Sequence, residues 1–186
     1  MGATKSVCEL YCQNVLSKNT DIISVRFGNV LGSSGSVIPK FQNQINNDDD
    51  ITVTHKDITR YFMLVNEACN LVYQAASIGN HGEILILDMG KPVKITDLAN
   101  KMIELSGKNY LKVKYTGLRK GEKLYEELLF SNNDKKTQYD SITIAKKRTI
   151  DFKMLENKIN LLLIDDTDKL KILKKIVPDF NHLRDN

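Results

Sequence analysis

Cysteine and histidine are scarce in this chain of 186 residues, which holds three of each. Cys8, Cys12 and Cys69 are odd in number and form no C-x-x-C pair, so we expect reduced thiols rather than a disulfide framework. The histidines are scattered and show none of the spacings typical of zinc sites. The sequence therefore predicts no structural metal.

Long apolar runs are also missing. No stretch approaches the roughly 20 apolar residues that a membrane span needs, and the N-terminus lacks the basic-then-apolar order of a signal peptide. Hydrophobic residues make up 41% of the chain and charged residues 27%, as in ordinary soluble globular proteins. We therefore expect a cytoplasmic protein, and a membrane anchor upstream of this chain is compatible with that expectation.

The sequence also lacks basic residues concentrated on one predicted face. The formal net charge is +4, and the residues after Asp134 alternate KK with DD. Nucleic-acid binders gather their basic residues on one face. A solvated helix surface is therefore the favoured interpretation of this charge, with RNA or DNA binding as a minor alternative.

Helix and strand patterns alternate along the chain, which predicts an α/β fold with a parallel or mixed sheet. Asn66 and Thr96 are the expected N-caps of two of the helices. Hydrophobic periodicity predicts helices over residues 3–17, 37–45, 66–77, 96–107 and 123–130, and strands over 22–30, 51–55, 83–88 and 111–115.

The polar stretch 131–140 is the best candidate for a domain boundary. Beyond it, FKMLENKINLLL and DKLKILKKI have the pattern of two amphipathic helices, the second ended by Pro178. The sequence thus predicts a first domain over residues 1–132 and a helical tail over 133–186.

Glycines and hydroxyls follow the first strand in the segment GNVLGSSGS. We reject a dinucleotide fingerprint, because Arg26 interrupts the apolar strand and the next carboxylates, Asp48 to Asp50, lie in a polar turn. Two interpretations carry equal weight: a flexible loop, or a loop whose backbone N–H groups approach an anion. The residues of the anion interpretation are Asn29, Ser33, Ser34 and Ser36.

Two arginines mark further candidate anion sites. Arg119 lies with Lys120 and Lys123 where a loop opens the predicted helix 123–130, and a helix N-terminus favours phosphate. Ordinary surface charge is the alternative there. Arg60 directly precedes an apolar run, which indicates a bidentate phosphate or carboxylate partner. Asp57, three residues earlier, is an equally weighted structural partner for it.

Five segments together resemble a known family: MGATK, VRFGNVLGSSGSVIPKF, TVTHKDITRYFM, GEILILDMGKPVKITDLA and TGLRKGEKLYEELL. In this order and spacing they closely resemble the nucleotide-sugar 4,6-dehydratases of bacterial polysaccharide and flagellin-glycan biosynthesis. These lyases are extended short-chain dehydrogenases/reductases that act on UDP-N-acetylglucosamine. The resemblance covers roughly residues 1 to 130. It implies the C-terminal part of a Rossmann-like fold without the N-terminal NAD-binding βαβ units, and therefore an inactive fragment.

The resemblance also implies roles for individual residues. Met1 stands where relatives carry the catalytic Tyr, and a thioether has no proton to give, so acid and base chemistry must come from elsewhere. Lys5 would bind the nicotinamide ribose of NAD or NADP. The substrate-binding residues would be Asn29, Arg60 and Arg119 on the UDP diphosphate, Ser33, Ser34 and Ser36 in the loop beside it, and Glu122.

The reaction implied moves a hydride from sugar C4 to the cofactor, eliminates water across C5 and C6, and returns the hydride to C6. The partners implied are a UDP-sugar and, for the full-length enzyme, further copies of itself. Two other functions stay open. One is a nucleotide-sugar epimerase of the same superfamily, which the Met at the Tyr position disfavours. The other is a noncatalytic UDP-binding or oligomerisation module.

Overall fold

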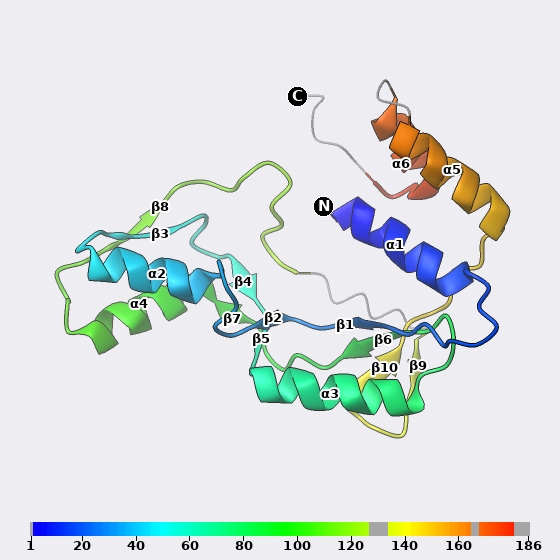
Figure 1. Ribbon diagram of the computed structural model, residues 1–186. Coiled ribbons are helices and arrows are strands. Elements are labelled where there is room, and N and C mark those ends of the chain that lie inside the picture. Colours follow the sequence, from blue (N-terminus) through cyan, green and yellow to red (C-terminus); the bar gives the residue numbers. More distant parts are fainter. Residues whose placement is uncertain (1, 127–133, 165–167, 181–186) are drawn as a thin grey trace. The chain divides into compact units, whose positions relative to one another are not determined.

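The chain forms two compact units in the computed structural model, which describes residues 2–126, 134–164 and 168–180 (Figure 1). Unit 1 comprises Met1–Arg26, Leu71–Leu87 and Leu129–Asn186, and unit 2 comprises Phe27–Asn70 and Asp88–Leu128. Helix α3 (Val65–Ile78) contributes residues to both. Each unit mixes helices with strands, so the α/β class expected from the sequence is confirmed.

Unit 1 is built on a four-stranded mixed sheet. Its strands are β1 (Ser24–Arg26), β6 (Ile84–Leu87), β9 (Lys135–Lys136) and β10 (Ile142–Ile144), in the spatial order β1-β6-β10-β9. β1 runs parallel to β6, and β10 runs antiparallel to it. All four residues of β6 are buried, as a central strand requires.

The described residues of unit 1 also form three whole helices, α1 (Gly2–Asn14), α5 (Phe152–Ile164) and α6 (Lys169–Ile176), and the second part of α3. The two amphipathic tail helices expected from the sequence are confirmed, and α6 ends ahead of Pro178. The compact units do not follow the boundary expected after residue 132, because β9 and β10 join the same sheet as β6.

The described residues of unit 2 form three two-stranded sheets, two whole helices and the first part of α3. β2 (Asn29–Val30) pairs with β5 (Phe62–Met63), β3 (Ile51–Val53) with β8 (Val113–Tyr115), and β4 (Thr59–Arg60) with β7 (Val93–Lys94). The helices are α2 (Val37–Asn46) and α4 (Ile95–Ser106). One core joins them to β3: Phe41, Ile45, Ile51, Val53, Ile58, Ile95, Ala99, Ile103 and Leu111.

Helix α4 shows how the sequence pattern produces this core. Ile95, Ala99 and Ile103 recur every four residues and are buried along one stripe. Gly107 closes the helix in the left-handed region, with φ of 72°, as expected from its position.

The expected caps are wrong. Thr96 lies inside α4 and its hydroxyl donates to the carbonyl of Lys56, and Asn66 lies inside the first turn of α3. Thr96 lies two positions past the N-cap of α4, which is Lys94, and Asn66 is the second residue of α3, so neither acts as an N-cap.

The single strand expected over residues 22–30 is wrong, because the chain changes pairing partner within it. Ser24–Arg26 pairs with β6, whereas Asn29–Val30 pairs with β5. Gly28 lies at the break, where an added Cβ would come within 3.0 Å of the Tyr61 carbonyl oxygen and 2.9 Å of the Met89 sulfur. This glycine therefore permits a close approach of the chain to itself, which any side chain would prevent.

The helix expected over residues 123–130 is also wrong in its described part, because residues 123–126 are irregular. The carbonyl of Leu124 accepts a hydrogen bond from the backbone N–H of Thr59 at 3.2 Å. The carbonyl of Lys123 accepts one from the Arg60 guanidinium at 2.9 Å. Lateral bonds of this kind replace the helical pairing. The rest of the expected helix lies outside the described residues.

Two kinds of feature, a membrane-spanning helix and a cluster of metal ligands, are absent from the residues that the structure describes. Within residues 2–126, 134–164 and 168–180, no helix is both long enough and apolar enough to cross a membrane. In the same ranges, no cluster of three or more His, Cys, Asp or Glu side chains is placed to hold a metal ion.

Candidate functional site

A cavity of about 320 Å³ opens in unit 2, beside α2, β3 and β4. This volume lies in the usual range for small-molecule sites, which combine apolar walls with a few polar groups. The apolar lining is Val30, Leu31, Val37, Ile38, Phe41, Val53, Ile58, Phe62 and Ile95. The polar lining is Asn29, Ser36, Lys40, Thr52, Thr54, Arg60, Arg119 and Glu122.

Five residues singled out in the sequence meet at this cavity, although up to 93 positions separate them. Asn29 belongs to β2, Ser36 precedes α2, and Arg60 belongs to β4. Arg119 and Glu122 come from the segment that follows β8. The tertiary structure of unit 2 thus gathers three separate segments around one opening.

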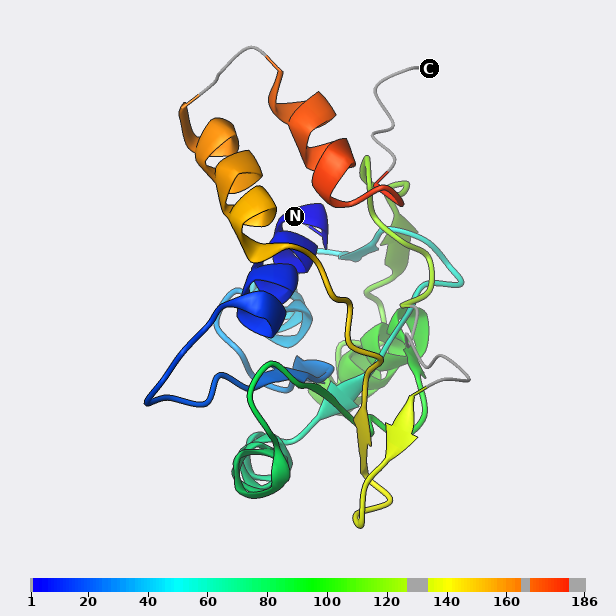
Figure 2. The ribbon, with the colours of Figure 1, turned by 90° about the vertical axis from the view of Figure 1, so that its right-hand side faces the viewer.

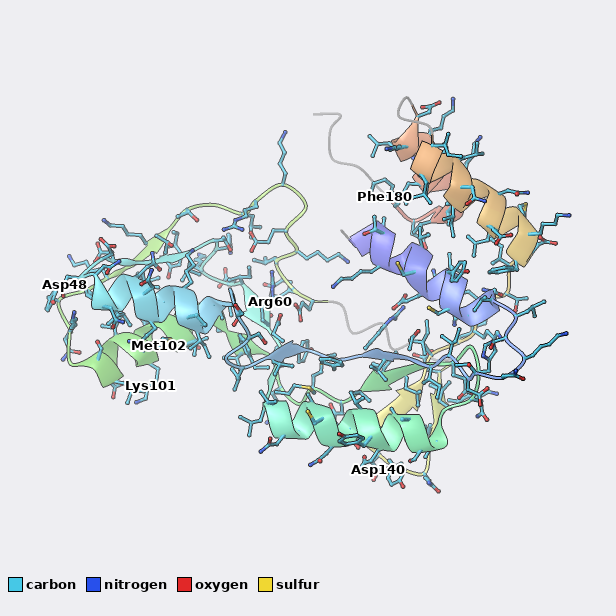
Figure 3. All side chains as sticks on the ribbon, in the orientation of Figure 1. Asp48, Arg60, Lys101, Met102, Asp140 and Phe180 are labelled. Carbon is cyan, nitrogen blue, oxygen red and sulfur yellow. The ribbon has the colours of Figure 1, made fainter. Side chains whose placement is uncertain are left out.

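Arg60 is the most heavily engaged of these side chains (Figure 3). Its guanidinium donates to the carbonyls of Thr59 at 2.7 Å and of Lys123 at 2.9 Å. Two carboxylates lie near it, with Oε1 of Glu122 at 3.7 Å and Oε1 of Glu126 at 3.5 Å. The side chain is only 19% exposed. Arg60 therefore ties the segment after residue 119 to β4.

Asp57 is not the partner of Arg60, contrary to the structural alternative suggested by the sequence. Its carboxylate pairs instead with Nζ of Lys94 at 3.4 Å, across the β4–β7 pair. A structural carboxylate for Arg60 does exist, but it comes from a distant part of the chain.

Glu122 links three elements through its two carboxylate oxygens. Oε1 accepts a hydrogen bond from the Thr54 hydroxyl at 3.1 Å, beside β3. Oε2 accepts one from the backbone N–H of Arg119 at 3.0 Å. The same carboxylate lies near Arg60. Glu122 therefore fixes the turn that carries Arg119 at the edge of the cavity.

Arg119 differs from Arg60 in that its guanidinium has no carboxylate partner among the described residues. It is exposed and lines the cavity. An exposed guanidinium beside a cavity is a ready donor for two oxygens of a phosphate or carboxylate group. Arg119 therefore stays a candidate for contact with an anion at this cavity.

The loop after β2 is held by its own hydroxyl groups. The Ser33 hydroxyl donates to the carbonyl of Val30 at 2.6 Å, and the Ser36 hydroxyl donates to the carbonyl of Ser33. Gly32 and Gly35 have φ of 77° and 71°, which allow the tight turns between these residues. Ser33 and Ser34 do not line the cavity, whereas Gly32 and Ser36 do.

Asn29 contributes an amide that is already hydrogen-bonded. Its Nδ2 donates to the carbonyl of Tyr61 at 3.0 Å and to Oε1 of Glu126 at 3.4 Å. The amide thus helps to hold β2 against the neighbouring strand at the cavity wall.

Lys5 lies in α1, within unit 1, and is exposed without an ion-pair partner among the described residues. Glu9, one turn later, does not pair with it. Its carboxylate instead accepts two hydrogen bonds from Arg26, at 2.5 and 2.6 Å, and this pairing raises the pKa of Arg26. Met1 lies outside the described residues.

Sequence reasoning missed Thr54 and Glu126. The alternation in ITVTH is a usable signal for Thr54, because it places the threonines on the face opposite to Ile51 and Val53. Glu126 carried no such signal, since its segment has the pattern of a helix but is held in an irregular conformation by Arg60.

Known proteins show what this chain is similar to. The capsular polysaccharide biosynthesis protein CapD of Staphylococcus aureus is 47% identical over 182 residues, which cover 94% of this chain and 30% of CapD. The chain therefore spans less than a third of the length of this relative.

Two solved structures resemble the chain. The X-ray structure of Pen from Bacillus thuringiensis has a TM-score of 0.69 and 33% identity, covering 88% of this chain and 58% of Pen. The UDP-N-acetylglucosamine 4-epimerase from Methanobrevibacter ruminantium M1, in complex with UDP-N-acetylmuramic acid, has a TM-score of 0.55 and 25% identity. That match covers 70% of this chain and 44% of the epimerase.

These similarities confirm the Rossmann-like fold of extended short-chain dehydrogenases/reductases that the sequence motifs implied. One protein family, described as "Polysaccharide biosynthesis protein", matches residues 1–147. This match takes in unit 2 whole, with the cavity and all of its lining residues. The chain belongs to this polysaccharide biosynthesis protein family.

Proposed function

We propose that unit 2 carries the nucleotide-sugar site of a UDP-N-acetylglucosamine 4,6-dehydratase of bacterial polysaccharide biosynthesis. One observation supports this most: five of the residues assigned to the substrate by motif resemblance line a single cavity. Family membership and the similarity to CapD support a role in making surface polysaccharide.

The cavity has the chemistry that a nucleoside diphosphate sugar requires. Arg119 provides a guanidinium that no carboxylate of the described residues pairs with, and the planar fork of Arg matches two phosphate oxygens at once. Arg60 is proposed as the second phosphate ligand. Its ion pairs with Glu122 and Glu126, at 3.7 and 3.5 Å, are longer than direct hydrogen bonds, so a phosphate oxygen can compete with them.

The remaining lining suits the uncharged parts of such a ligand. Apolar side chains such as Phe41 and Phe62 offer surface to a flat base or to the faces of a sugar ring. Glu122 offers carboxylate oxygens that accept hydrogen bonds from hydroxyl groups. Ser33 and Ser34 are proposed to act only by shaping the loop from which Gly32 and Ser36 reach the cavity.

A nicotinamide cofactor fits unit 1 in one respect, which is the state of Lys5. Its ammonium is exposed and unpaired among the described residues, as donation to the hydroxyls of a ribose requires. The pairing of Glu9 with Arg26 keeps that carboxylate from competing for Lys5. NAD or NADP would supply hydride acceptance and return at the sugar, and Lys5 would hold the cofactor's ribose in place.

A nucleotide-sugar epimerase is the second candidate. It is favoured by the similarity to the solved UDP-N-acetylglucosamine 4-epimerase, which is in complex with UDP-N-acetylmuramic acid. The motif resemblance, which assigns Met1 to the position of the catalytic Tyr, favours the dehydratase over the epimerase, because a thioether cannot give or take a proton.

The test is calorimetric titration of UDP into the parent chain at fixed salt. Arg119→Ala should weaken UDP binding roughly ten- to a hundredfold, because a charge-assisted hydrogen bond contributes about 1.5 to 3 kcal/mol. Arg148→Ala is the matched control, since Arg148 carries the same charge but does not line the cavity. Unchanged UDP affinity in a folded Arg119→Ala variant would show that the cavity is not the diphosphate site.

A further inference from the structure

Within unit 1, the apolar face of helix α1 is buried against α5 and α6, the two tail helices. Val7 and Leu10, on one face of α1, belong to the same core cluster as Leu155 of α5 and Ile176 of α6. Figures 1 and 2 show α5 and α6 beside α1 from two directions. Val7 and Leu10 are 9% and 5% exposed, so this face of α1 is almost fully buried.

Polar contacts fix α1 to the same part of the chain. The Asn14 amide donates to the carbonyl of Arg148 at 3.0 Å and its oxygen accepts the backbone N–H of Ile150 at 3.1 Å. The rings of Tyr11 and Phe152 lie 5.3 Å apart. Hydrogen bonds to both sides of one amide fix the position of a helix end much more narrowly than apolar packing alone.

Such cover matters because α1 is short. A helix of 13 residues is marginal in water on its own and depends on packing of its apolar face. The residues that provide this packing lie after position 147, where the match to the polysaccharide biosynthesis family ends. The two tail helices therefore lie beyond the residues that the family matches and pack on α1, which lies within them.

We infer that α5 and α6 are the positioning element of α1, and through α1 of Lys5. Leu155 is the central residue of this element, since it is fully buried in the cluster that holds α1. The importance of Lys5 rests on the proposed function. The packing of the tail on α1 is independent of the proposed function.

The cysteines allow a direct test in the intact chain. Cys8 and Cys12 lie in α1, Cys12 being half-buried, whereas Cys69 lies in α3 and serves as an internal reference. Leu155→Ala should speed the labelling of Cys12 by a thiol reagent roughly tenfold, because loss of the cover increases local opening of α1. The rate at Cys69 should stay unchanged.

Matched variants separate positioning from general damage. Leu163→Ala, on the same helix at a site that is 75% exposed, should leave both labelling rates at the parent values. Leu155→Met, which keeps the volume, should restore slow labelling of Cys12. Should Leu155→Ala fail to fold, the milder Ile176→Val must show the same selective increase at Cys12.

Equal acceleration at Cys12 and Cys69, or no acceleration at either in a folded variant, would overturn the inference. UDP titration of the same Leu155→Ala protein keeps the two proposals apart. UDP affinity should match that of the parent, because no residue of the cavity belongs to the tail. A parent chain that fails to bind UDP would count against the proposed function and leave the labelling result standing.

Discussion

Single residues at the cavity divide between holding the protein together and being available to a ligand. Arg60 is held by two backbone carbonyls and lies near two carboxylates, whereas Arg119 has no carboxylate partner among the described side chains. The two arginines were assigned the same role from the motif, but their surroundings differ. Removing Arg60 should therefore affect the structure of the site as well as the affinity for an anion.

Arg60→Ala should weaken UDP binding at least roughly tenfold and should also free the segment that it holds. Arg60→Lys should recover only part of the affinity, because a point charge cannot reproduce the planar fork. Calorimetry measures the affinity, and the rate of tryptic cleavage after Lys123 measures the release of the segment. Arg119→Ala is the control, since it should lower affinity without faster cleavage there. Parent-like affinity and cleavage in Arg60→Ala would show that Arg60 has neither role.

Elements of unit 2 are joined by charged side chains at the turn after α2. Asp48, labelled in Figure 3, has φ of 58° and accepts hydrogen bonds from Lys108, at 2.7 Å, and from the Tyr110 hydroxyl. The Lys108 ammonium and then Tyr110 hold the pKa of Asp48 below its ordinary value of 3.8. The backbone N–H of Lys112 does the same for Asp50. These contacts connect the end of α2 to the segment between α4 and β8.

The lowered pKa of Asp48 fixes the direction of a pH effect. A carboxylate with a lowered folded-state pKa adds stability that is fully present above its unfolded value and is lost as pH falls through the folded value. Urea unfolding midpoints measured from about pH 6 to about pH 2.5 should therefore fall less steeply below about pH 4 in Asp48→Asn than in the parent. Asp49, the neighbour in sequence, provides the control variant Asp49→Asn. Identical acid limbs for the parent and Asp48→Asn would contradict the assigned role.

At the scale of the whole molecule, two core clusters formed by described residues share no member. One joins α2, β3 and α4 in unit 2, and the other joins α1, α5 and α6 in unit 1. Each core is composed entirely of residues from its own unit. A large-to-small substitution in one core should therefore first destabilise the helices and strands that contribute to that core.

Ile45→Ala tests this at the centre of unit 2, where Ile45 is 2% exposed and does not line the cavity. The substitution should lower the free energy of unfolding by about 2 to 5 kcal/mol. Native-state hydrogen exchange should show reduced protection in α2 and α4 before any reduction in β6. Leu105→Ala, at a 75% exposed site on α4, is the control and should change stability by less than about 0.5 kcal/mol. Equal loss of protection in α4 and in β6, the buried strand of unit 1, would mean that the two units unfold together.

The sequence by itself determined most of the elements, because local periodicity and local breakers decide them. Hydrophobic periodicity predicted a helix over residues 96–107, which the structure has as α4 (Ile95–Ser106). The apolar run in EILILD predicted the buried strand β6. The motif segments predicted the superfamily fold, and the family match and the solved structures confirm it.

Only the tertiary structure decided which of these residues meet, and how each is engaged. The strand over residues 22–30 divides because its two halves find different partners, which no local pattern encodes. The helix expected from residue 123 is absent up to Glu126 because Thr59 and Arg60, more than 60 positions away, bind its carbonyls. Periodicity reports the surroundings of a residue within one element. Pairing between distant segments depends on contacts that form only when the chain folds. The sequence therefore indicated individual residues of the cavity, but not that they lie around one opening.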